Sequence, residues 1–254
     1  MKTVAIIQAR MGSTRLPGKV LKPLGGKSVL GHVITRVMAC QRVDQTVIAT
    51  TTHPADDVVA AEAVKWGATV FRGNESDVLE RYYQAAQSVH ADVVIRITSD
   101  SPLFDPVILC TMLEQLDALR RNGTTVDYFS NVLVRTFPLG LAAEIFTMRA
   151  FSRVFAEAVK DYEREHVTPY FYLHPELFSL HSYTSAVDLS HHRWTLDTTE
   201  DFELIQSVYA ALHRDGEIFS TEQVLKFLAA HPEIEKINAH IQQVKLPTQT
   251  QNSA

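Results

Sequence analysis

The sequence predicts an α/β protein in which a mostly parallel sheet of about seven strands lies between two layers of helices. Three observations support this fold class: strands and helices alternate through the first half, the early strands are short apolar runs, and capping residues bound the helices. Short apolar runs are typical of parallel strands that are covered on both faces. The second half alternates less regularly, which predicts a portion of mixed strand direction late in the chain.

The first half supplies four expected strands, at residues 3–8, 45–51, 68–73 and 92–98. Apolar residues at helical spacing predict a helix after each of them. The first, second and fourth of these helices are expected over 29–40, 56–66 and 106–121, and the third follows Ser76 and carries Val78, Leu79, Tyr82, Tyr83 and Ala86. Ser28 and Ser76 are the expected N-caps of the first and third helices, and Asp105 followed by Pro106 opens the fourth. Gly67 ends the second helix.

The second half predicts four further strand-like segments, at residues 126–134, 141–148, 177–184 and 193–196. Helices are expected over 150–160, 164–173, 199–213 and 221–230, with Pro169 kinking or ending the second of these. Residues 1–245 are expected to form one domain. Residues 246–254 lack apolar side chains after Leu246 and are expected to be a flexible tail.

The composition excludes several classes of protein. The chain has 254 residues, 46% hydrophobic residues and a net charge of -5, which argues against a nucleic-acid-binding surface. No apolar run is long enough to insert in a membrane, and the chain starts as a strand instead of a signal peptide, so we expect a cytoplasmic protein. Cys40 and Cys110 lie in helix-like apolar patterns and are expected to be free, buried thiols without a disulfide framework.

A basic, glycine-containing loop follows the first strand. Arg10, Arg15 and Lys19 place positive charge there, and Gly12 and Gly18 let backbone N–H groups approach a ligand. Ligands of open α/β sheets bind at the carboxyl ends of strands, so the loop favours a triphosphate-binding role, with a solvated basic loop as the alternative.

Two standard phosphate-binding motifs are absent. Five residues separate the two glycines and a valine follows the lysine, so this loop is no Walker A motif, and no G-x-G-x-x-G is present.

Two aspartates lie at expected strand ends far apart in the sequence. Asp100 follows the fourth strand, and Asp197 follows "RWTL". Two carboxylates completed by phosphate oxygens and water suit an octahedral Mg²⁺ ion. The alternative from the residues alone is that each aspartate forms a turn or a helix cap.

The segment "YEREHVTPYFY" is a candidate for acceptor binding. It sets Arg164 and His166 before a group of aromatic residues. The alternative is an exposed polar helix start with an aromatic face in the core. Arg135 and Glu144 are weaker candidates of the same kind, and His191 with His192 is expected to form a surface turn.

The chain resembles the cytidylyltransferase family that activates sugar acids. The matching segments are "QARMGSTRLPGKVLKPLGGKSVL", "RITSDSPLFDP", "YEREHVTPYFY" and "RWTLDTTEDFELI". The resemblance is to the branch of spore-coat polysaccharide biosynthesis protein F, related to Kdo and acylneuraminate cytidylyltransferases. It implies a nucleotide-diphospho-sugar transferase fold, Rossmann-like and of GT-A type. It also implies Mg²⁺-dependent transfer from CTP to a sugar or sugar acid for cell-surface or spore-coat polysaccharide, and a possible homodimer.

The resemblance also implies roles for individual residues. The expected catalytic residues are Arg10, Arg15 and Lys19, and the metal ligands are Asp100 and Asp197. The expected nucleotide-binding residues are Ala9, Arg10, Gly12, Ser13, Lys19 and Thr98. Acceptor binding is expected from Glu144, Arg164 and His166, with His166 orienting hydroxyls or acting as a general base.

Two departures from the family pattern affect these roles. Ala142 stands where relatives commonly have an aspartate after Gly-Leu, and Thr98 stands where Kdo-type enzymes have a glutamine near the base. Two other functions stay open on the sequence alone: a glycosyltransferase of similar fold, or a non-catalytic nucleotide- or sugar-binding partner. The gap in "DSPLFD" is longer than that of a D-x-D glycosyltransferase motif.

Overall fold

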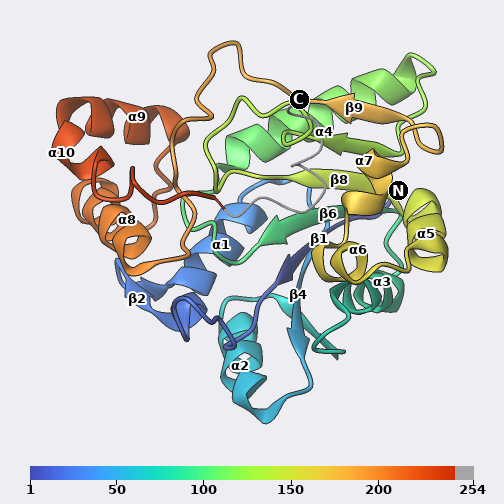
Figure 1. Cartoon of the computed structure of the whole chain (residues 1–254), viewed down its shortest axis with the longest axis horizontal. Helices are drawn as coiled ribbons and strands as arrows, with labels where there is room; N and C mark the ends of the chain where they lie inside the picture. Colours follow the sequence, from blue (N-terminus) through green and yellow to red (C-terminus); the bar gives the residue numbers. More distant parts are fainter. Residues whose placement is uncertain (244–254) are drawn as a thin grey trace.

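The structure is a computed structural model and describes residues 1–243. It contains a seven-stranded sheet in the order β5-β4-β1-β6-β8-β7-β9 (Figure 1). The strands are β1 (Thr3–Gln8), β4 (Gln45–Thr51), β5 (Thr69–Gly73), β6 (Val93–Thr98), β7 (Tyr128–Ser130), β8 (Glu144–Thr147) and β9 (Leu180–Ser182). The tail predicted at 246–254 lies outside the described residues.

Strand direction changes at β8. The pairs β5–β4, β4–β1 and β1–β6 are parallel, β8 is antiparallel to both β6 and β7, and β9 is parallel to β7. A short antiparallel hairpin of β2 (Pro23–Leu24) and β3 (Lys27–Ser28) lies outside this sheet. The predicted fold class is confirmed, including the mixed portion late in the chain.

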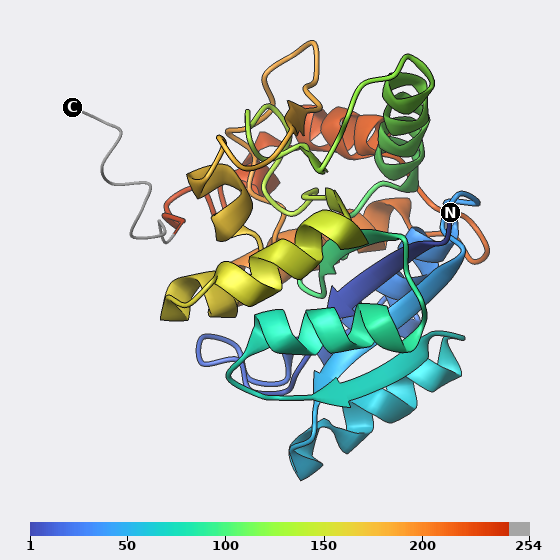
Figure 2. The ribbon, with the colours of Figure 1, turned by 90° about the vertical axis from the view of Figure 1, so that its right-hand side faces the viewer.

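Helices cover both faces of the sheet (Figures 1 and 2). The α-helices are α1 (Val29–Met38), α2 (Asp57–Lys65), α3 (Val78–Ser88), α4 (Pro106–Arg121), α5 (Met148–Glu157), α6 (Asp161–His166), α7 (Pro169–Leu173), α8 (Thr199–Leu212), α9 (Thr221–Ala230) and α10 (Pro232–Glu235). Two 3₁₀ turns, η1 (Lys19–Leu21) and η2 (Pro54–Asp56), complete the elements.

The helix caps follow the sequence with one exception. The Ser28 side chain accepts from the Gly31 N–H at 2.9 Å, and the Asp105 side chain from the Val107 N–H at 2.9 Å, as predicted. Asp77, not Ser76, caps α3 by accepting from the Glu80 N–H at 2.9 Å. The helix predicted over 164–173 is divided into α6 and α7, with Pro169 as the first residue of α7.

Two hydrophobic cores lie on opposite faces of the sheet because side chains alternate along each strand. In β1, Ala5 and Ile7 join the core under α1, α2, α4, α8 and α9. Val4 and Ile6 join the second core under α3, α5 and α7. The apolar content of the strands therefore serves both helical layers.

The strand predicted at 193–196 is wrong. Arg193 forms an isolated bridge with Leu139, and the following residues are in no strand. Trp194 donates its N–H to the Leu139 carbonyl at 2.7 Å, and Leu196 donates to the Asp100 carbonyl at 2.8 Å. The segment is apolar because Trp194 and Leu196 are buried in the core, which explains its strand-like pattern.

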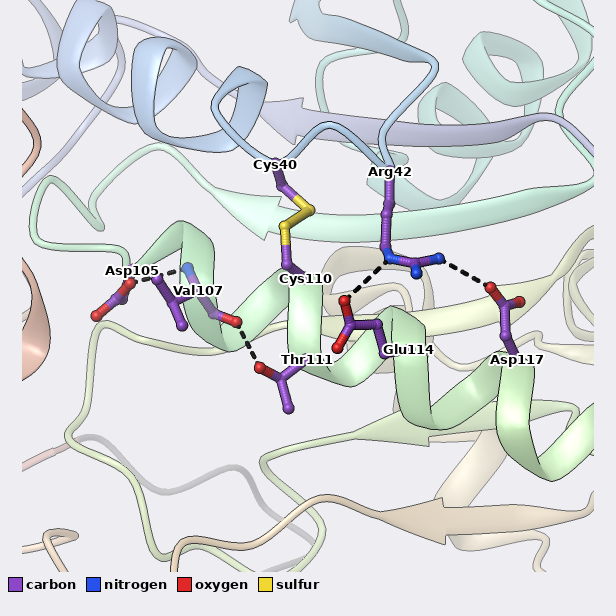
Figure 3. Close-up of a disulfide and its surroundings, with 8 residues drawn as sticks. All are labelled: Cys40, Arg42, Asp105, Val107, Cys110, Thr111, Glu114 and Asp117. Carbon is purple, nitrogen blue, oxygen red and sulfur yellow. Dashed lines mark hydrogen bonds and ion pairs between the residues drawn. A yellow bond between two sulfur atoms is a disulfide. The ribbon is translucent and has the colours of Figure 1, made fainter.

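The prediction of two free thiols is also wrong. Cys40, after α1, and Cys110, in α4, form a disulfide with 5.6 Å between their Cα atoms (Figure 3). Beside it, Arg42 bridges to Glu114 and Asp117 of α4 at 3.4 and 3.1 Å. The sequence does not predict this disulfide, because the two cysteines are 70 residues apart and only the packing of α1 against α4 brings them together.

Within residues 1–243, none of the helices has the length and apolar content that a bilayer span requires.

Candidate active site

The basic loop after β1 folds back on itself. The Met11 carbonyl accepts from the N–H groups of Ser13 (2.8 Å) and Gly18 (3.2 Å), and the Met11 N–H donates to Asp56 at 2.7 Å. Gly18 has φ of 67°, a left-handed conformation that glycine adopts without a Cβ penalty. Leu16 and Val20 are buried. The loop is therefore held at both ends of the basic stretch, and it presents Lys19 to the ends of the strands.

The Lys19 ammonium lies between the two aspartates predicted as metal ligands. Its Nζ is 3.1 Å from Asp100 and 2.8 Å from Asp197, and it also donates to the Leu196 carbonyl at 2.7 Å. Arg15 lies 3.1 Å from the same Asp197 oxygen. Two carboxylates that are 97 residues apart in the chain thus converge on one cationic group.

These charges determine protonation at the centre of the site. Burial alone would lower the pKa of Lys19, but the Asp100 and Asp197 carboxylates outweigh it and raise that pKa. Burial would raise the pKa of Asp100, whereas the Lys19 ammonium and a hydrogen bond from Thr98 lower it. Lys19 is therefore a cation and Asp100 an anion at neutral pH.

A buried network holds the segment that carries Asp197. Arg193 donates two hydrogen bonds to Asp201, both at 2.8 Å, and Asn238 donates to the same carboxylate at 2.9 Å. Asp201 in turn accepts from the N–H groups of Asp197 (2.9 Å) and Thr198 (3.0 Å) at the start of α8. This network fixes the backbone at Asp197 next to Asp100. The sequence reasoning missed both Arg193 and Asp201.

A cleft of about 300 Å³ opens above the ends of β1 and β6. Of the predicted residues, those that line it are Ala9, Arg10, Gly12, Ser13, Arg15, Lys19, Thr98, Asp100, His166 and Asp197. Five other polar residues line the same cleft and carry no prediction: Gln8, Thr14, Arg81, Ser99 and Glu165. The loop, the strand ends and the start of α3 thus meet around one space.

Two predicted acceptor residues lie outside the lining of this cleft. Glu144, in β8, is buried, pairs with Arg96 and accepts from the Tyr128 hydroxyl at 2.5 Å. Arg164 donates to Asp77 at 2.6 Å and to the Ala158 carbonyl at 2.9 Å. Arg164 therefore joins α6 to the N-terminus of α3 in this structure.

His166, the third predicted acceptor residue, ends α6 and reaches the cleft next to Glu165. Burial lowers its pKa, Glu165 opposes this and Arg96 adds to the lowering. A neutral imidazole at the edge of the cleft can accept a proton or a hydrogen bond from a hydroxyl group.

The other residues singled out in the sequence lie elsewhere. Arg135 and Ala142 line a separate small hollow, and Arg135 donates to the Ser190 carbonyl at 2.7 Å. His191 and His192 adjoin Glu235 of α10, and His192 pairs with that carboxylate.

The acidic pair fits a divalent cation. Mg²⁺ takes carboxylate oxygens and keeps several waters, so two converging carboxylates beside an open cleft are a suitable protein contribution. The contacts of Lys19 show that both carboxylates reach a single cationic position.

The family model described as cytidylyltransferase matches residues 4–243. The chain belongs to the cytidylyltransferase family. Membership makes it a nucleotidyltransferase, and it agrees with the loop and strand-end geometry described above.

Two curated relatives align over most of the chain, and a third, named as a cytidylyltransferase, aligns over 45% of it. It is 36% identical over 229 residues to the spore coat polysaccharide biosynthesis protein SpsF of Bacillus subtilis, covering 86% of this chain and 91% of that protein. It is 35% identical over 247 residues to an uncharacterised protein of Methanocaldococcus jannaschii, covering 96% and 97%. A 3-deoxy-manno-octulosonate cytidylyltransferase of Trichlorobacter lovleyi is 32% identical over 114 residues, 45% of this chain and 44% of that protein.

Solved cytidylyltransferase structures share the fold. A cytidylyltransferase from Leptospira borgpetersenii superposes with a TM-score of 0.87 at 34% identity, covering 97% of this chain and all of that one. The CTP complex of CMP:2-keto-3-deoxy-manno-octonic acid synthetase superposes with a TM-score of 0.64 at 17% identity, covering 83% and 99%. At that identity the likeness concerns the fold alone.

Proposed function

We propose that this cytidylyltransferase transfers CMP from CTP to a hydroxyl of a sugar or sugar acid, for cell-surface or spore-coat polysaccharide. The convergence of Asp100 and Asp197 on the Lys19 ammonium beside a basic loop carries the proposal. The names of the relatives support it, because SpsF is a spore-coat polysaccharide protein and a structural neighbour binds CTP.

In the proposed reaction, the acceptor oxygen forms a bond to the α-phosphorus of CTP. The bond from that phosphorus to the bridging oxygen breaks, pyrophosphate leaves with the electron pair, and the hydroxyl proton passes to a base or to solvent. Such reactions depend on positioning and on charge stabilisation more than on covalent work by the protein.

The basic residues of the loop bind the charged part of the nucleotide in this proposal. Arg10 and Arg15 are half exposed and pair with Glu75 at 3.7 Å and with Asp197 at 3.1 Å. In the proposal both guanidinium groups turn from these partners toward the β- and γ-phosphates. Lys19 stabilises the charge that grows on the leaving pyrophosphate. The backbone around Ala9, Gly12 and Ser13, together with Thr98, lines the rest of the nucleotide site.

Asp100 and Asp197 would hold Mg²⁺, which when bound neutralises charge on the phosphate oxygens. On the acceptor side, His166 is the proposed contact with the hydroxyl group, because it is the predicted acceptor residue that lines the cleft. Glu144 and Arg164 can bind the acceptor only if their contacts with Arg96, Tyr128 and Asp77 break.

The first experiment is a thermal-shift panel with CTP, UTP, GTP and ATP, each with Mg²⁺. A ligand at 100 times its dissociation constant stabilises the protein by about 2.7 kcal/mol. We expect CTP to stabilise the wild type, and the Mg²⁺-dependent part to be lost in Asp100→Asn/Asp197→Asn. Asp117→Asn, on the exposed face of α4, is the matched control.

Pyrophosphate release then identifies the acceptor, with CTP and a series of sugars and sugar acids. If no nucleotide at millimolar concentration shifts the wild type, the triphosphate site and the proposed reaction are both wrong.

A further inference from the structure

Two buried polar atoms of residues that line the cleft have no hydrogen-bond partner among residues 1–243. They are the side-chain oxygen Oε1 of Gln8 and the guanidinium nitrogen Nε of Arg81. A buried polar group without a partner costs free energy, so such groups in a native structure need an explanation. A ligand that is not part of the structure is one explanation, and here both atoms belong to the same cleft.

The fold places these two side chains on one wall. Gln8 ends β1 in register with Thr98 of β6, which also lines the cleft. Arg81 lies one turn after Val78 on α3, so both side chains share a helix face. The neighbouring Tyr82 hydroxyl lies 3.2 Å from the carbonyl oxygens of both Ile6 and Ile97, which fixes α3 across β1 and β6.

This wall differs chemically from the phosphate side. The loop cations and the two aspartates already account for the triphosphate and its counterion. The wall adds an amide, a guanidinium and the apolar Val78 side chain. Amide and guanidinium groups are the side chains that read the polar edge of a base, and an apolar side chain packs against its face.

The other contacts of Arg81 hold its guanidinium group in a fixed orientation, which suits recognition of a base. Its Nη1 donates to the carbonyl oxygens of Asn74 and, at 3.3 Å, Glu75, which orients the guanidinium without using Nε. The Gln8 amide rotates easily about its terminal torsion, so its unpaired oxygen can turn toward a bound base.

We propose that Gln8 and Arg81 select the base of the nucleotide, with the Gln8 oxygen accepting from the 4-amino group of cytosine and Arg81 donating to the 2-oxygen. The inference rests on the proposed use of CTP and adds which residues recognise it. Thr98 stands where Kdo-type enzymes have a glutamine. The Gln8 side chain places an amide beside that position, on the neighbouring strand β1.

The test measures binding of CTP, UTP and the 2-pyrimidinone ribonucleoside triphosphate, which lacks the 4-amino group, by calorimetric titration with Mg²⁺. Pyrophosphate is titrated in parallel as a ligand without a base. The variants are Gln8→Met, Gln8→Glu and Arg81→Lys. Gln84→Met is the matched control, because Gln84 lies on α3 outside the cleft lining and bonds to Glu80.

We expect Gln8→Met to bind CTP about tenfold more weakly, since one base contact is lost, while pyrophosphate binding stays unchanged. The 2-pyrimidinone nucleotide should bind wild type and Gln8→Met equally, because neither complex has the amino contact. Gln8→Glu should raise the preference for CTP over UTP about tenfold, because a carboxylate only accepts hydrogen bonds. Arg81→Lys should weaken CTP and UTP to the same extent, since both carry the 2-oxygen.

The inference is overturned if Gln8→Met binds CTP as tightly as the wild type, or if it loses CTP and pyrophosphate equally. A loss of pyrophosphate binding in Arg81→Lys would show a structural role for Arg81. If the wild type binds pyrophosphate but prefers UTP, base selection as proposed here is wrong while the nucleotidyltransferase reaction stands. If the wild type binds no nucleotide at all, the proposed function fails, and this inference fails with it.

Discussion

At the scale of single residues, Lys19 contacts two carboxylates and also adjoins the cleft proposed for the triphosphate. Its ammonium is only 11% exposed and contacts two carboxylates, yet it adjoins the open cleft where a triphosphate is proposed to bind. The same charge that holds Asp100 and Asp197 together therefore faces the substrate.

Removal of Lys19 is expected to slow turnover strongly and leave the fold intact. Lys19→Met should lower kcat by on the order of 10²–10³, the usual cost of losing one charge-stabilising group. Pyrophosphate release with CTP and far-ultraviolet circular dichroism measure the two effects. Lys22→Met is the control, because Lys22 lies over the Phe202 ring at 5.0 Å and does not line the cleft. Near-normal turnover of Lys19→Met would remove the loop from the mechanism.

His32 shows how burial affects titration away from the active site. Its Nε2 lies 2.6 Å from the Leu24 carbonyl and its ring packs against Tyr209. Burial lowers its pKa to about 4; the Leu24 carbonyl opposes this, while Arg36 adds to the lowering. Between pH 6.5 and 4 the unfolded chain therefore binds a proton that the folded chain does not.

The free energy of unfolding should consequently fall as the pH falls through this window, by up to about 3 kcal/mol from this residue. Urea titrations between pH 7 and pH 4 on the wild type and on His32→Gln measure the effect, since glutamine can donate the same hydrogen bond without titrating. Parallel pH profiles of the two proteins would contradict the prediction.

At the scale of elements, the segment between the Arg193 bridge and α8 positions the second aspartate. This segment is not held by strand pairing in the sheet. The buried Arg193–Asp201 ion pair and the hydrogen bond from the Leu196 N–H to the Asp100 carbonyl hold it in place. Burial opposes both shifts, but contact between the charges raises the pKa of Arg193 and lowers that of Asp201.

Breaking this pair should destabilise the fold. Arg193→Met leaves the fully buried Asp201 carboxylate without its main counterion, which typically costs about 3–5 kcal/mol. Arg193→Met/Asp201→Asn should recover part of the loss, because the amide keeps an acceptor for the backbone N–H groups without a charge. Urea unfolding of the two variants and the wild type measures this. A double variant less stable than Arg193→Met would show that the charge is not the cause.

At the scale of the whole molecule, the Cys40–Cys110 disulfide joins the segment after α1 to α4, and Arg42 reinforces the same junction (Figure 3). A cross-link across 70 residues restricts the unfolded chain strongly.

Reduction should therefore lower the free energy of unfolding by about 4 kcal/mol in the chain-entropy treatment. Urea unfolding with and without dithiothreitol measures the loss. Cys110→Ala should show no response to the reductant. Two titratable thiols in the native, unreduced wild type would show that the pair is not bonded.

Local sequence patterns predict the α/β class and most element boundaries correctly, and they single out the basic loop, Asp100 and Asp197 as candidate site residues. Local periodicity, caps and the place of Asp100 after β6 carry that information, as the agreement at Gln45–Thr51 and Pro106–Arg121 shows. Asp197 follows a segment that is not a strand. The features that depend on residues far apart in the sequence are visible only in the folded chain. The Cys40–Cys110 bond, the Arg193–Asp201 pair and the partners of Glu144 all join segments or side chains whose proximity no local pattern encodes. The same holds for Gln8 and Arg81. They become candidates for base recognition only because α3 packs beside the end of β1 and brings both side chains to one cleft.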